Sequence, residues 1–270
     1  MDLIALLEGV LPPILIALAL VSIAGNRLLP MAMALGLGAA FVLLKSWPLL
    51  PHELWLKPKG LDWLLWGVIA LALAASLEHW RCLPARSSSW LVAVIGAGVV
   101  WLMLDKLAGR ESTGWAVAHV GGGGIGVMLL TFGGARVVAR AESSPFLPLL
   151  FTAVLSIDAV LLTLGRSALY GQLCGACAAA VGAAIGTALW RRPFTMAGPD
   201  AALCGAVHGL FLLAGVHLAY LTWPVALLAA VMPVLPLVLP KSFAKERPKR
   251  WMLVALVLVA LPAGVAIAIS

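Results

Sequence analysis

Apolar segments long enough to cross a lipid bilayer follow one another along almost the whole chain. A helix needs about 20 predominantly apolar residues to cross the hydrocarbon core of a membrane. Ten segments approach this length, and each is closed by charges, prolines or tryptophans. The ten predicted spans cover residues 3–24, 28–44, 61–77, 90–107, 113–138, 146–164, 168–190, 201–220, 221–239 and 251–269.

The longest apolar stretch, residues 201–239, must contain two of these spans. As one helix it would be roughly 58 Å long, about twice the thickness of the hydrocarbon core. The two aromatic residues and the proline between Tyr220 and Pro224 suit a turn at a membrane surface. We therefore predict a hairpin that turns there.

The composition fits a membrane protein and excludes the soluble classes. Hydrophobic residues make up 63% of the chain and charged residues 11%, whereas about 25% of a soluble domain is charged. Such a chain could not cover itself with polar groups in water, which excludes a soluble enzyme, a nucleic-acid-binding domain, a coiled coil and a disordered protein. We predict an all-α transmembrane bundle of about ten spans (eight to ten). It forms a single integral membrane domain over residues 1–270, with no soluble domain.

A boundary near residue 141 divides the ten predicted spans into five and five. An odd number of spans in each half would place the halves in opposite orientations, which is the inverted-repeat plan of many transporters. The halves show no convincing common motif. The repeat is therefore predicted from the number of spans and not from sequence similarity.

The distribution of Lys and Arg predicts the orientation in the membrane. Ten spans place both termini on one side, and the loops on the opposite side carry 12 of the 18 basic residues. Basic residues favour cytoplasmic loops, so we predict both termini outside, in a multi-pass protein of a bacterial inner membrane. The cytoplasmic loop 241–250 would attract anionic lipid headgroups, although its charge could also serve orientation alone. The predicted lipid contacts are Lys241, Lys245, Arg247, Lys249 and Arg250.

Five ionisable side chains lie inside the predicted spans, where lipid penalises an unpaired polar group. They are Glu8, His119, Asp158, His208 and His217. Glu8, His119 and Asp158 each lie about 8–9 Å inside the same membrane face, and His208 lies about 18 Å from that face, near mid-depth. Three of the five residues therefore share one level in the membrane.

This common level predicts a polar site that binds a proton or a cation. Carboxylates are hard oxygen ligands, and histidine titrates near neutrality. Asp158 is the strongest candidate, because no charged residue is nearer in the sequence than Arg166. An alternative places Glu8 near the lipid headgroups, with each histidine bonded to neighbouring backbone. Asp62 and Asp105 stand at segment ends, where we expect water to reach them.

Glycine-rich spans predict close helix packing. The span 113–138 contains four consecutive glycines, which either open the backbone toward a cavity or form a smooth face for another helix. The Gly-x-x-x-Gly spacing favours the packing role. This spacing occurs at Gly122 and Gly126, at Gly182 and Gly186, and at Gly205 and Gly209.

Cys174 and Cys177 form a Cys-x-x-Cys pair on one face of a predicted helix. Such a pair could serve redox chemistry or bind a soft metal, but cysteine on a helix of small residues is more often a packing residue. No nucleotide, haem or metal motif stands out in the sequence. We therefore predict no cofactor and no metal site.

These features predict a proton-coupled secondary transporter or exporter of a small solute or cation. Asp158, His119 and Glu8 would form the substrate or proton site, with His208 and His217 as relays. One alternative is a non-catalytic membrane subunit that scaffolds a larger homo- or hetero-oligomeric complex. Another is an intramembrane enzyme that acts on a lipid-linked substrate, with Asp158 and a histidine as acid and base. The sequence shows no nucleophile for such an enzyme, so we assign no catalytic residue, and we expect no nucleic-acid partner.

Overall fold

The structure, a computed structural model, describes residues 3–45, 48–56, 59–141, 146–190 and 196–237. Every regular element in this described part is helical, which confirms the predicted all-α class. Six helices are long and apolar enough to cross a membrane, so the chain is a multi-pass membrane protein. The predicted count of ten spans is not confirmed, and the predicted span 251–269 lies outside the described residues.

The helices follow the hydrophobic segmentation of the sequence closely. The six long helices run over Gly60–His79, Ala85–Ala108, Thr113–Arg140, Leu147–Leu164, Ala168–Thr187 and Gly198–Leu218, and shorter apolar helical stretches run over Gly9–Ala24, Leu29–Leu44 and Trp223–Leu237. The elements are α1 (Leu3–Ala24), η1 (Gly25–Leu28), α2 (Leu29–Leu44), α3 (Pro51–Leu56), α4 (Gly60–His79), α5 (Ala85–Ala108), α6 (Thr113–Ala116), η2 (Val117–Gly121), α7 (Gly122–Ala141), α8 (Phe146–Leu164), α9 (Ala168–Trp190), α10 (Gly198–Leu218), α11 (Trp223–Val231) and η3 (Met232–Leu237).

Local sequence explains where several helices begin and end. Proline stands in the first turn of α2, α10 and α11, where its missing N–H costs nothing. Arg81, Arg166 and Tyr220 follow α4, α8 and α10 with positive φ angles. Each closes its helix with a bond from the next residue's N–H to a carbonyl five or six residues earlier, such as Cys82 N to Leu77 O at 2.8 Å and Leu221 N to Gly215 O at 2.9 Å. The turn after α10 separates α10 from α11, so the long apolar stretch 201–239 forms two helical segments and not one.

The glycine-rich span does not break at its four glycines. Instead α6, η2 and α7 follow one another directly, and the intervening Val117–Gly121 segment is π-helical. A π-helical turn widens the backbone and is frequent at functional sites. This turn contains His119, so the local widening falls on one of the residues that the sequence singles out.

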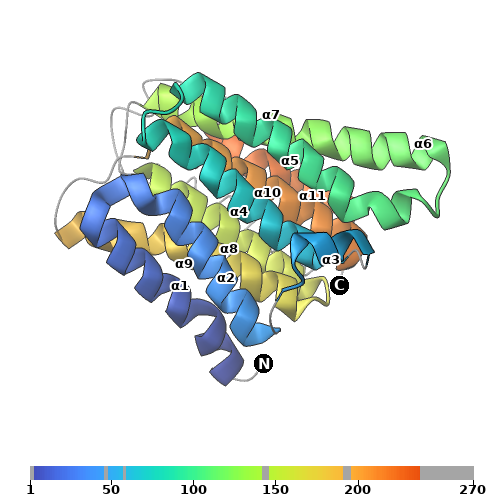
Figure 1. The fold of residues 1–270 in the computed structure, drawn as a ribbon, viewed down its shortest axis with the longest axis horizontal. Helices are drawn as coiled ribbons and strands as arrows, with labels where there is room; N and C mark the ends of the chain where they lie inside the picture. Colours follow the sequence, from blue (N-terminus) through green and yellow to red (C-terminus); the bar gives the residue numbers. More distant parts are fainter. Residues whose placement is uncertain (1–2, 46–47, 57–58, 142–145, 191–195, 238–270) are drawn as a thin grey trace.

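The crossing helices pack as two groups. Helices α1, α2, α8 and α9 form the first group, and α4, α5, α7, α10 and α11 form the second. In Figure 1 the blue and yellow helices of the first group lie beside the cyan, green and orange helices of the second. The groups meet mainly where α2 packs on α4 and where α8 packs on α10.

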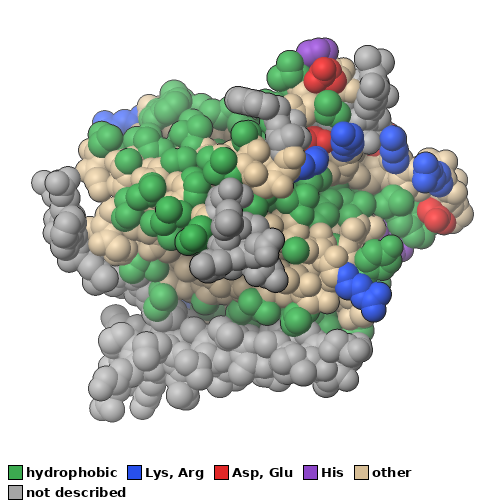
Figure 2. All heavy atoms as spheres, turned by 90° about the horizontal axis from the view of Figure 1, so that it is seen from below, with side chains coloured by type: hydrophobic (Ala, Val, Ile, Leu, Met, Phe, Trp, Pro, Cys, Tyr) green, Lys and Arg blue, Asp and Glu red, His purple; other side chains and the backbone are tan. Residues whose placement is uncertain are grey.

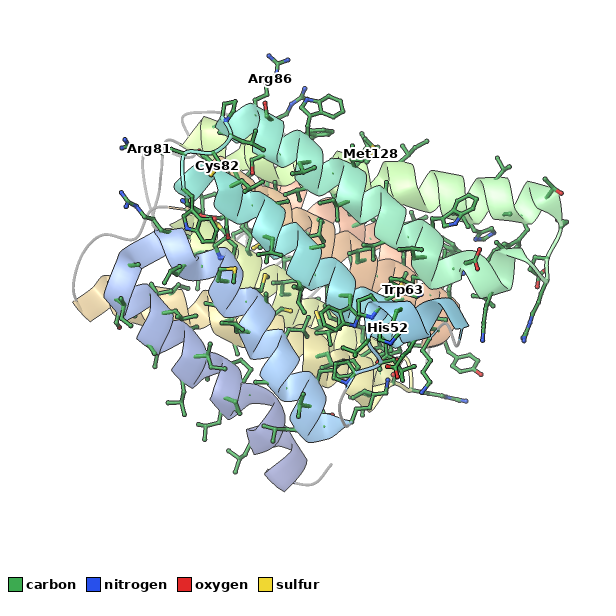
Figure 3. All side chains as sticks on the ribbon, viewed as in Figure 1. His52, Trp63, Arg81, Cys82, Arg86 and Met128 are labelled. Atoms are coloured by element: carbon green, nitrogen blue, oxygen red, sulfur yellow. The ribbon has the colours of Figure 1, made fainter. Side chains whose placement is uncertain are left out.

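The surface and the ends of the bundle differ in polarity. Figure 2 shows hydrophobic side chains over the middle of one face, while most Lys and Arg side chains in view gather toward one end. In Figure 3 the labelled Arg81, Cys82 and Arg86 lie at one end of the bundle and His52 and Trp63 at the other. An apolar middle with polar ends is the arrangement that a bilayer requires.

Four of the six glycines expected at helix contacts lie against another helix. A Cβ atom on Gly205 would clash with the carbonyl oxygen of Leu130, and one on Gly209 would lie 3.1 Å from Val127 Cγ2, so both bring α10 against α7. A Cβ on Gly182 would lie 3.1 Å from Thr152 Cγ2, and one on Gly186 only 3.9 Å from Leu18.

Gly122 and Gly126 differ from the packing role that their spacing predicts. Among the described residues, no atom of another helix lies within 4 Å of a Cβ built on either one. Both residues instead line a cavity of about 260 Å³ between α7, α10 and α11. Their missing side chains contribute to the volume of this cavity.

We expect Gly205→Ala to destabilise the bundle by about 1–3 kcal/mol, because α7 and α10 must separate to admit the methyl group. In a Cys82→Ser background, thermal unfolding can be followed by the reaction of a fluorogenic maleimide with Cys174, Cys177 and Cys204, which are buried in the folded chain. The matched control, Gly126→Ala, should leave the unfolding temperature unchanged. Equal unfolding temperatures for the two variants would contradict close packing at Gly205.

Candidate functional site

The central polar contact joins Asp158 of α8 to His208 of α10. Asp158 Oδ2 lies 2.5 Å from His208 Nδ1, and both side chains are fully buried. Because α8 belongs to the first helix group and α10 to the second, this pair bridges the two groups. The candidate that the sequence ranks first therefore has a histidine partner at the main interface of the bundle.

Each member of this pair also carries a buried polar atom without a partner. Asp158 Oδ1 and His208 Nε2 make no hydrogen bond to any residue that the structure describes. A carboxylate beside a neutral imidazole has a net charge of −1, and burying a net charge in an apolar interior is costly. One bound proton makes the pair neutral. An arrangement of this kind can bind a proton, and Asp158 Oδ1 and His208 Nε2 remain to contact a further ligand.

His119 and His217 meet in a second cluster, which is built from rings. His119 stacks on Trp115 with a centroid distance of 4.4 Å, and the His119 and His217 centroids are 5.1 Å apart. Trp223 of α11 lies 5.6 Å from both histidine rings. His119 Nδ1 and His217 Nε2 are buried without hydrogen-bond partners in the described part of the chain. Trp223 also lines the cavity between α7, α10 and α11, so the ring cluster stands at one end of that cavity.

The structure divides the predicted common site between different places. Asp158 pairs with His208, whereas His119 packs against His217 and two indoles. Glu8 lies in α1, which packs on α2 and α9, and its side chain is outside those that the structure describes. Depth along separate helices predicts the level of a residue in the membrane, but not its lateral neighbours.

A second buried Asp–His pair escaped the sequence analysis. His79 Nε2 at the end of α4 lies 2.7 Å from Asp200 Oδ1 in the first turn of α10. The other oxygen, Asp200 Oδ2, accepts the N–H of Ala197 at 3.0 Å. Nearby, Glu78 Oε2 is buried without a hydrogen-bond partner among the described residues. Both members of the pair stand at helix ends, which is why a search for charges inside spans overlooks them.

Asp62 is buried, contrary to the expectation that water reaches it. Lys45 Nζ lies 3.2 Å from Asp62 Oδ1, and the carboxylate side chain is only 2% exposed. Lys45 itself is 25% exposed and also lies over the ring of Phe41. The lysine comes from α2 and its partner from α4, so this ion pair is a second bridge between the helix groups. Asp105 is exposed, as expected.

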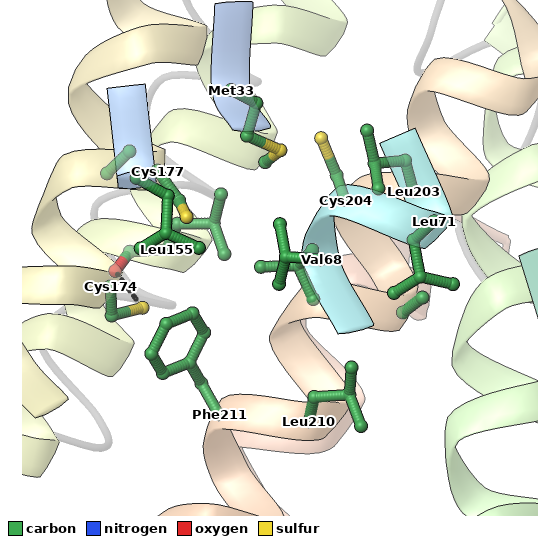
Figure 4. Packing of buried hydrophobic residues seen from close by; sticks show 14 of the residues in the cluster. Met33, Val68, Leu71, Leu155, Cys174, Cys177, Leu203, Cys204, Leu210 and Phe211 are labelled. Atoms are coloured by element: carbon green, nitrogen blue, oxygen red, sulfur yellow. Dashed lines mark hydrogen bonds between the residues drawn. The ribbon is translucent and has the colours of Figure 1, made fainter. Parts of the chain in front are cut away.

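The cysteines of the core occupy packing positions. Figure 4 shows Cys174, Cys177 and Cys204 among apolar side chains such as Phe211, and all three are buried. The Cys174 thiol donates to the carbonyl of Leu155 at 3.3 Å. Among the described residues, no group of three His, Cys, Asp or Glu side chains is placed to hold a metal ion.

Comparisons with models of protein families, with curated proteins and with solved structures find no match to this chain. The predicted lipid-contact residues Lys241, Lys245, Arg247, Lys249 and Arg250 lie outside the described residues. The functional argument therefore depends on the geometry of the described polar pairs.

We expect His208→Leu to destabilise the protein by about 3–5 kcal/mol, because it leaves the Asp158 carboxylate buried without a partner. The double variant Asp158→Leu/His208→Leu should recover much of this loss, since no charge is then buried. Thermal unfolding reported by the buried thiols measures both effects. His52→Leu, at an exposed histidine of α3, is the control and should change nothing. An additive double variant would contradict a direct Asp158–His208 interaction.

Proposed function

We propose that this chain is a proton-coupled secondary transporter or exporter of a small solute or cation, and that Asp158 and His208 form its coupling site. The observation that carries this proposal is the fully buried Asp158–His208 contact between the two helix groups. Ionisable groups away from water in membrane proteins mark proton and ion pathways. Asp158 is thus retained from the sequence prediction, and His208 becomes its direct partner.

The charge of the pair suggests how a proton and a substrate could be coupled. Without a proton the pair carries a net charge of −1, which either a proton or a cationic group of a substrate can compensate. Both ligands would then compete for one site. Competition of this kind exchanges protons for substrate when the site opens alternately to the two sides of the membrane.

The packing of the helices suits alternating access. The first two long elements of the sequence, α1 and α2, pack with α8 and α9, the first two helices after the predicted boundary near residue 141. The later helices α4, α5 and α7 pack with α10, and α11 packs on α10. This grouping is expected if the chain consists of two inverted halves, each of which contributes equivalent helices to both groups. Movement of one group against the other would act directly on the Asp158–His208 contact.

The orientation in the membrane also belongs to this proposal. The Lys and Arg bias places the loop between α4 and α5, with Arg81 and Arg86, in the cytoplasm and both termini outside. A bacterial inner membrane suits the short loops. The Lys241–Arg250 loop would then face the anionic cytoplasmic leaflet.

We expect Asp158→Asn to abolish substrate-driven proton flux, because the amide cannot hold the coupling proton. Proteoliposomes with an entrapped pH dye are tested against alkali and divalent cations, small amines and neutral solutes. One probe should drive proton movement through the wild-type protein. Asp105→Asn, at an exposed carboxylate of α5, is the matched control and should retain the flux.

Two outcomes would contradict the transporter. Wild-type flux in Asp158→Asn would remove the coupling role of this carboxylate. Absence of flux with every probe, together with stable association of the chain with other membrane proteins, would favour the scaffold subunit instead.

We expect Cys82 to react with a membrane-impermeant maleimide in inverted vesicles and not in intact cells. Cys82 is exposed in the loop after α4, whereas the other three cysteines are buried, so the native chain carries one reporter. Cys82→Ser should abolish labelling in both preparations. Labelling in intact cells would reverse the proposed orientation.

A further inference from the structure

Helices α4 and α10 share a pattern that appears when their first residues are aligned. Gly60 and Gly198 begin the two helices, 138 positions apart. Aspartate is the third residue of both helices, and histidine follows this aspartate after 17 positions in both. Identical residues occur 138 positions apart at Gly60 and Gly198, Asp62 and Asp200, Leu65 and Leu203, Gly67 and Gly205, and His79 and His217.

The neighbouring helices continue this register. Helix α5 begins at Ala85 and α11 at Trp223, which again are 138 positions apart. Helix α2 begins at Leu29 and α9 at Ala168, an offset of 139. The spacing therefore extends over several helices on either side of the proposed half boundary, which supports an inverted repeat at the level of residues.

The equivalent aspartates and histidines meet at opposite ends of one antiparallel helix pair. The end of α4 meets the start of α10 at the His79–Asp200 contact. The start of α4 meets the end of α10 as well, because a Cβ on Gly60 would lie 2.9 Å from Leu218 Cδ1. Asp62 and His217 thus stand at the end of the pair where the counterpart of His79–Asp200 is expected.

The two ends differ in which partners are engaged. At one end His79 Nε2 contacts Asp200, and both residues belong to the second helix group. At the other end the equivalent atom, His217 Nε2, is buried and forms no hydrogen bond with a described residue. Asp62 is instead paired with Lys45 of the first group. The aspartate at this end therefore ties the two groups together, whereas Asp200 does not.

We infer that Asp62 exchanges partners during the transport cycle, from Lys45 of α2 to His217 of α10. The exchange rests on the proposed transporter function and assigns Asp62, Lys45 and His217 as its gating residues at one membrane face. With Lys45 engaged, the first group is held against the second and this face is closed. With His217 engaged, the contact matches His79–Asp200 at the opposite face and the groups can part.

Protonation of His217 favours the exchange, since an imidazolium competes with the Lys45 ammonium for the carboxylate. The groups that face the exchanging residues are few in the described part of the chain. His119, Trp115 and Trp223 surround His217, and Tyr170 lies within electrostatic reach of Asp62. The equivalent His79 has Glu78 and Arg27 nearby in addition to Asp200.

The experiment measures the separation of the two helix groups at this face. Spin labels are placed at Leu43→Cys of α2 and Tyr220→Cys after α10, whose native side chains are 51% and 83% exposed, in a Cys82→Ser background. Double electron–electron resonance is recorded in lipid nanodiscs at pH about 8 and about 5, on either side of the ordinary titration of imidazole. We expect a short distance at high pH and an added longer population at low pH.

Three variants decide the assignment. Lys45→Ala should show the longer population at both pH values, because it removes the partner that closes the face. His217→Gln should abolish the growth of this population at low pH. Asp62→Asn also removes the closing contact and should show the longer population at both pH values, as Lys45→Ala does. His52→Gln, at an exposed histidine of α3 on the same face, is the control and should keep the wild-type response. Unreactive buried thiols in each variant show that it is folded.

A wild-type pH response in His217→Gln, or an unchanged distance distribution in Lys45→Ala, would overturn the inference. A distance distribution that does not change with pH would also overturn it, when recorded on the spin-labelled protein with Lys45, Asp62 and His217 in place. These outcomes are independent of the proton flux that Asp158→Asn tests, since the distance measurement needs no substrate. Failure of the gate and failure of the proposed transporter are therefore distinguishable.

Discussion

The cost of leaving a charge unpaired away from water governs every buried acid that the structure describes in this bundle. Asp62, Asp158 and Asp200 are the buried acidic residues of the described chain, and each contacts a basic side chain from another helix. In lipid, no solvent can replace a missing partner, so each contact fixes the relative position of two helices. Two of the three contacts lie between the helix groups and one lies within the second group.

Hydrophobicity alone predicted the helices well, because the bilayer imposes their length and excludes other secondary structure. The helix boundaries follow charges, prolines and tryptophans that are visible in the sequence. The π-helical turn at His119 was not predictable in this way, since nothing in the spacing distinguishes a widened turn from a broken one. Nor does the Gly-x-x-x-Gly spacing reveal whether a glycine meets another helix, as Gly205 does, or lines a cavity, as Gly126 does.

The candidate site was predictable in its residues more than in its contacts. Asp158 stood out because no nearby residue in the sequence could compensate its charge. The sequence analysis placed His208 at a different depth from Asp158, because the two depths were counted along separate helices without a common origin. The structure brings their side chains within 2.5 Å of each other. The level shared by Glu8, His119 and Asp158 described height in the membrane but carried no information on which helices are neighbours.

The acids at helix ends were overlooked for a different physical reason. A first-turn aspartate is commonly assigned to solvent, where it stabilises the positive end of the helix dipole. Asp62 and Asp200 occupy that position, but both are buried. Asp62 is paired with Lys45, and Asp200 is paired with His79. The equal 17-residue spacing from each aspartate to the histidine of the same helix could have revealed them. This signal becomes convincing only once the helix boundaries supply the register.

The three buried contacts also explain how proton binding could be linked to movement of the helix groups. Separation of the groups would break Asp158–His208 and Lys45–Asp62 while leaving His79–Asp200 intact. Each broken contact leaves a carboxylate whose negative charge must be compensated before the groups can separate. In the proposed mechanism a proton or a cation on Asp158 would compensate the first, and a protonated His217 would compensate the second. Movement without a ligand would leave an uncompensated carboxylate in an apolar interior. The free-energy cost of this unpaired charge is what would couple transport to the proton.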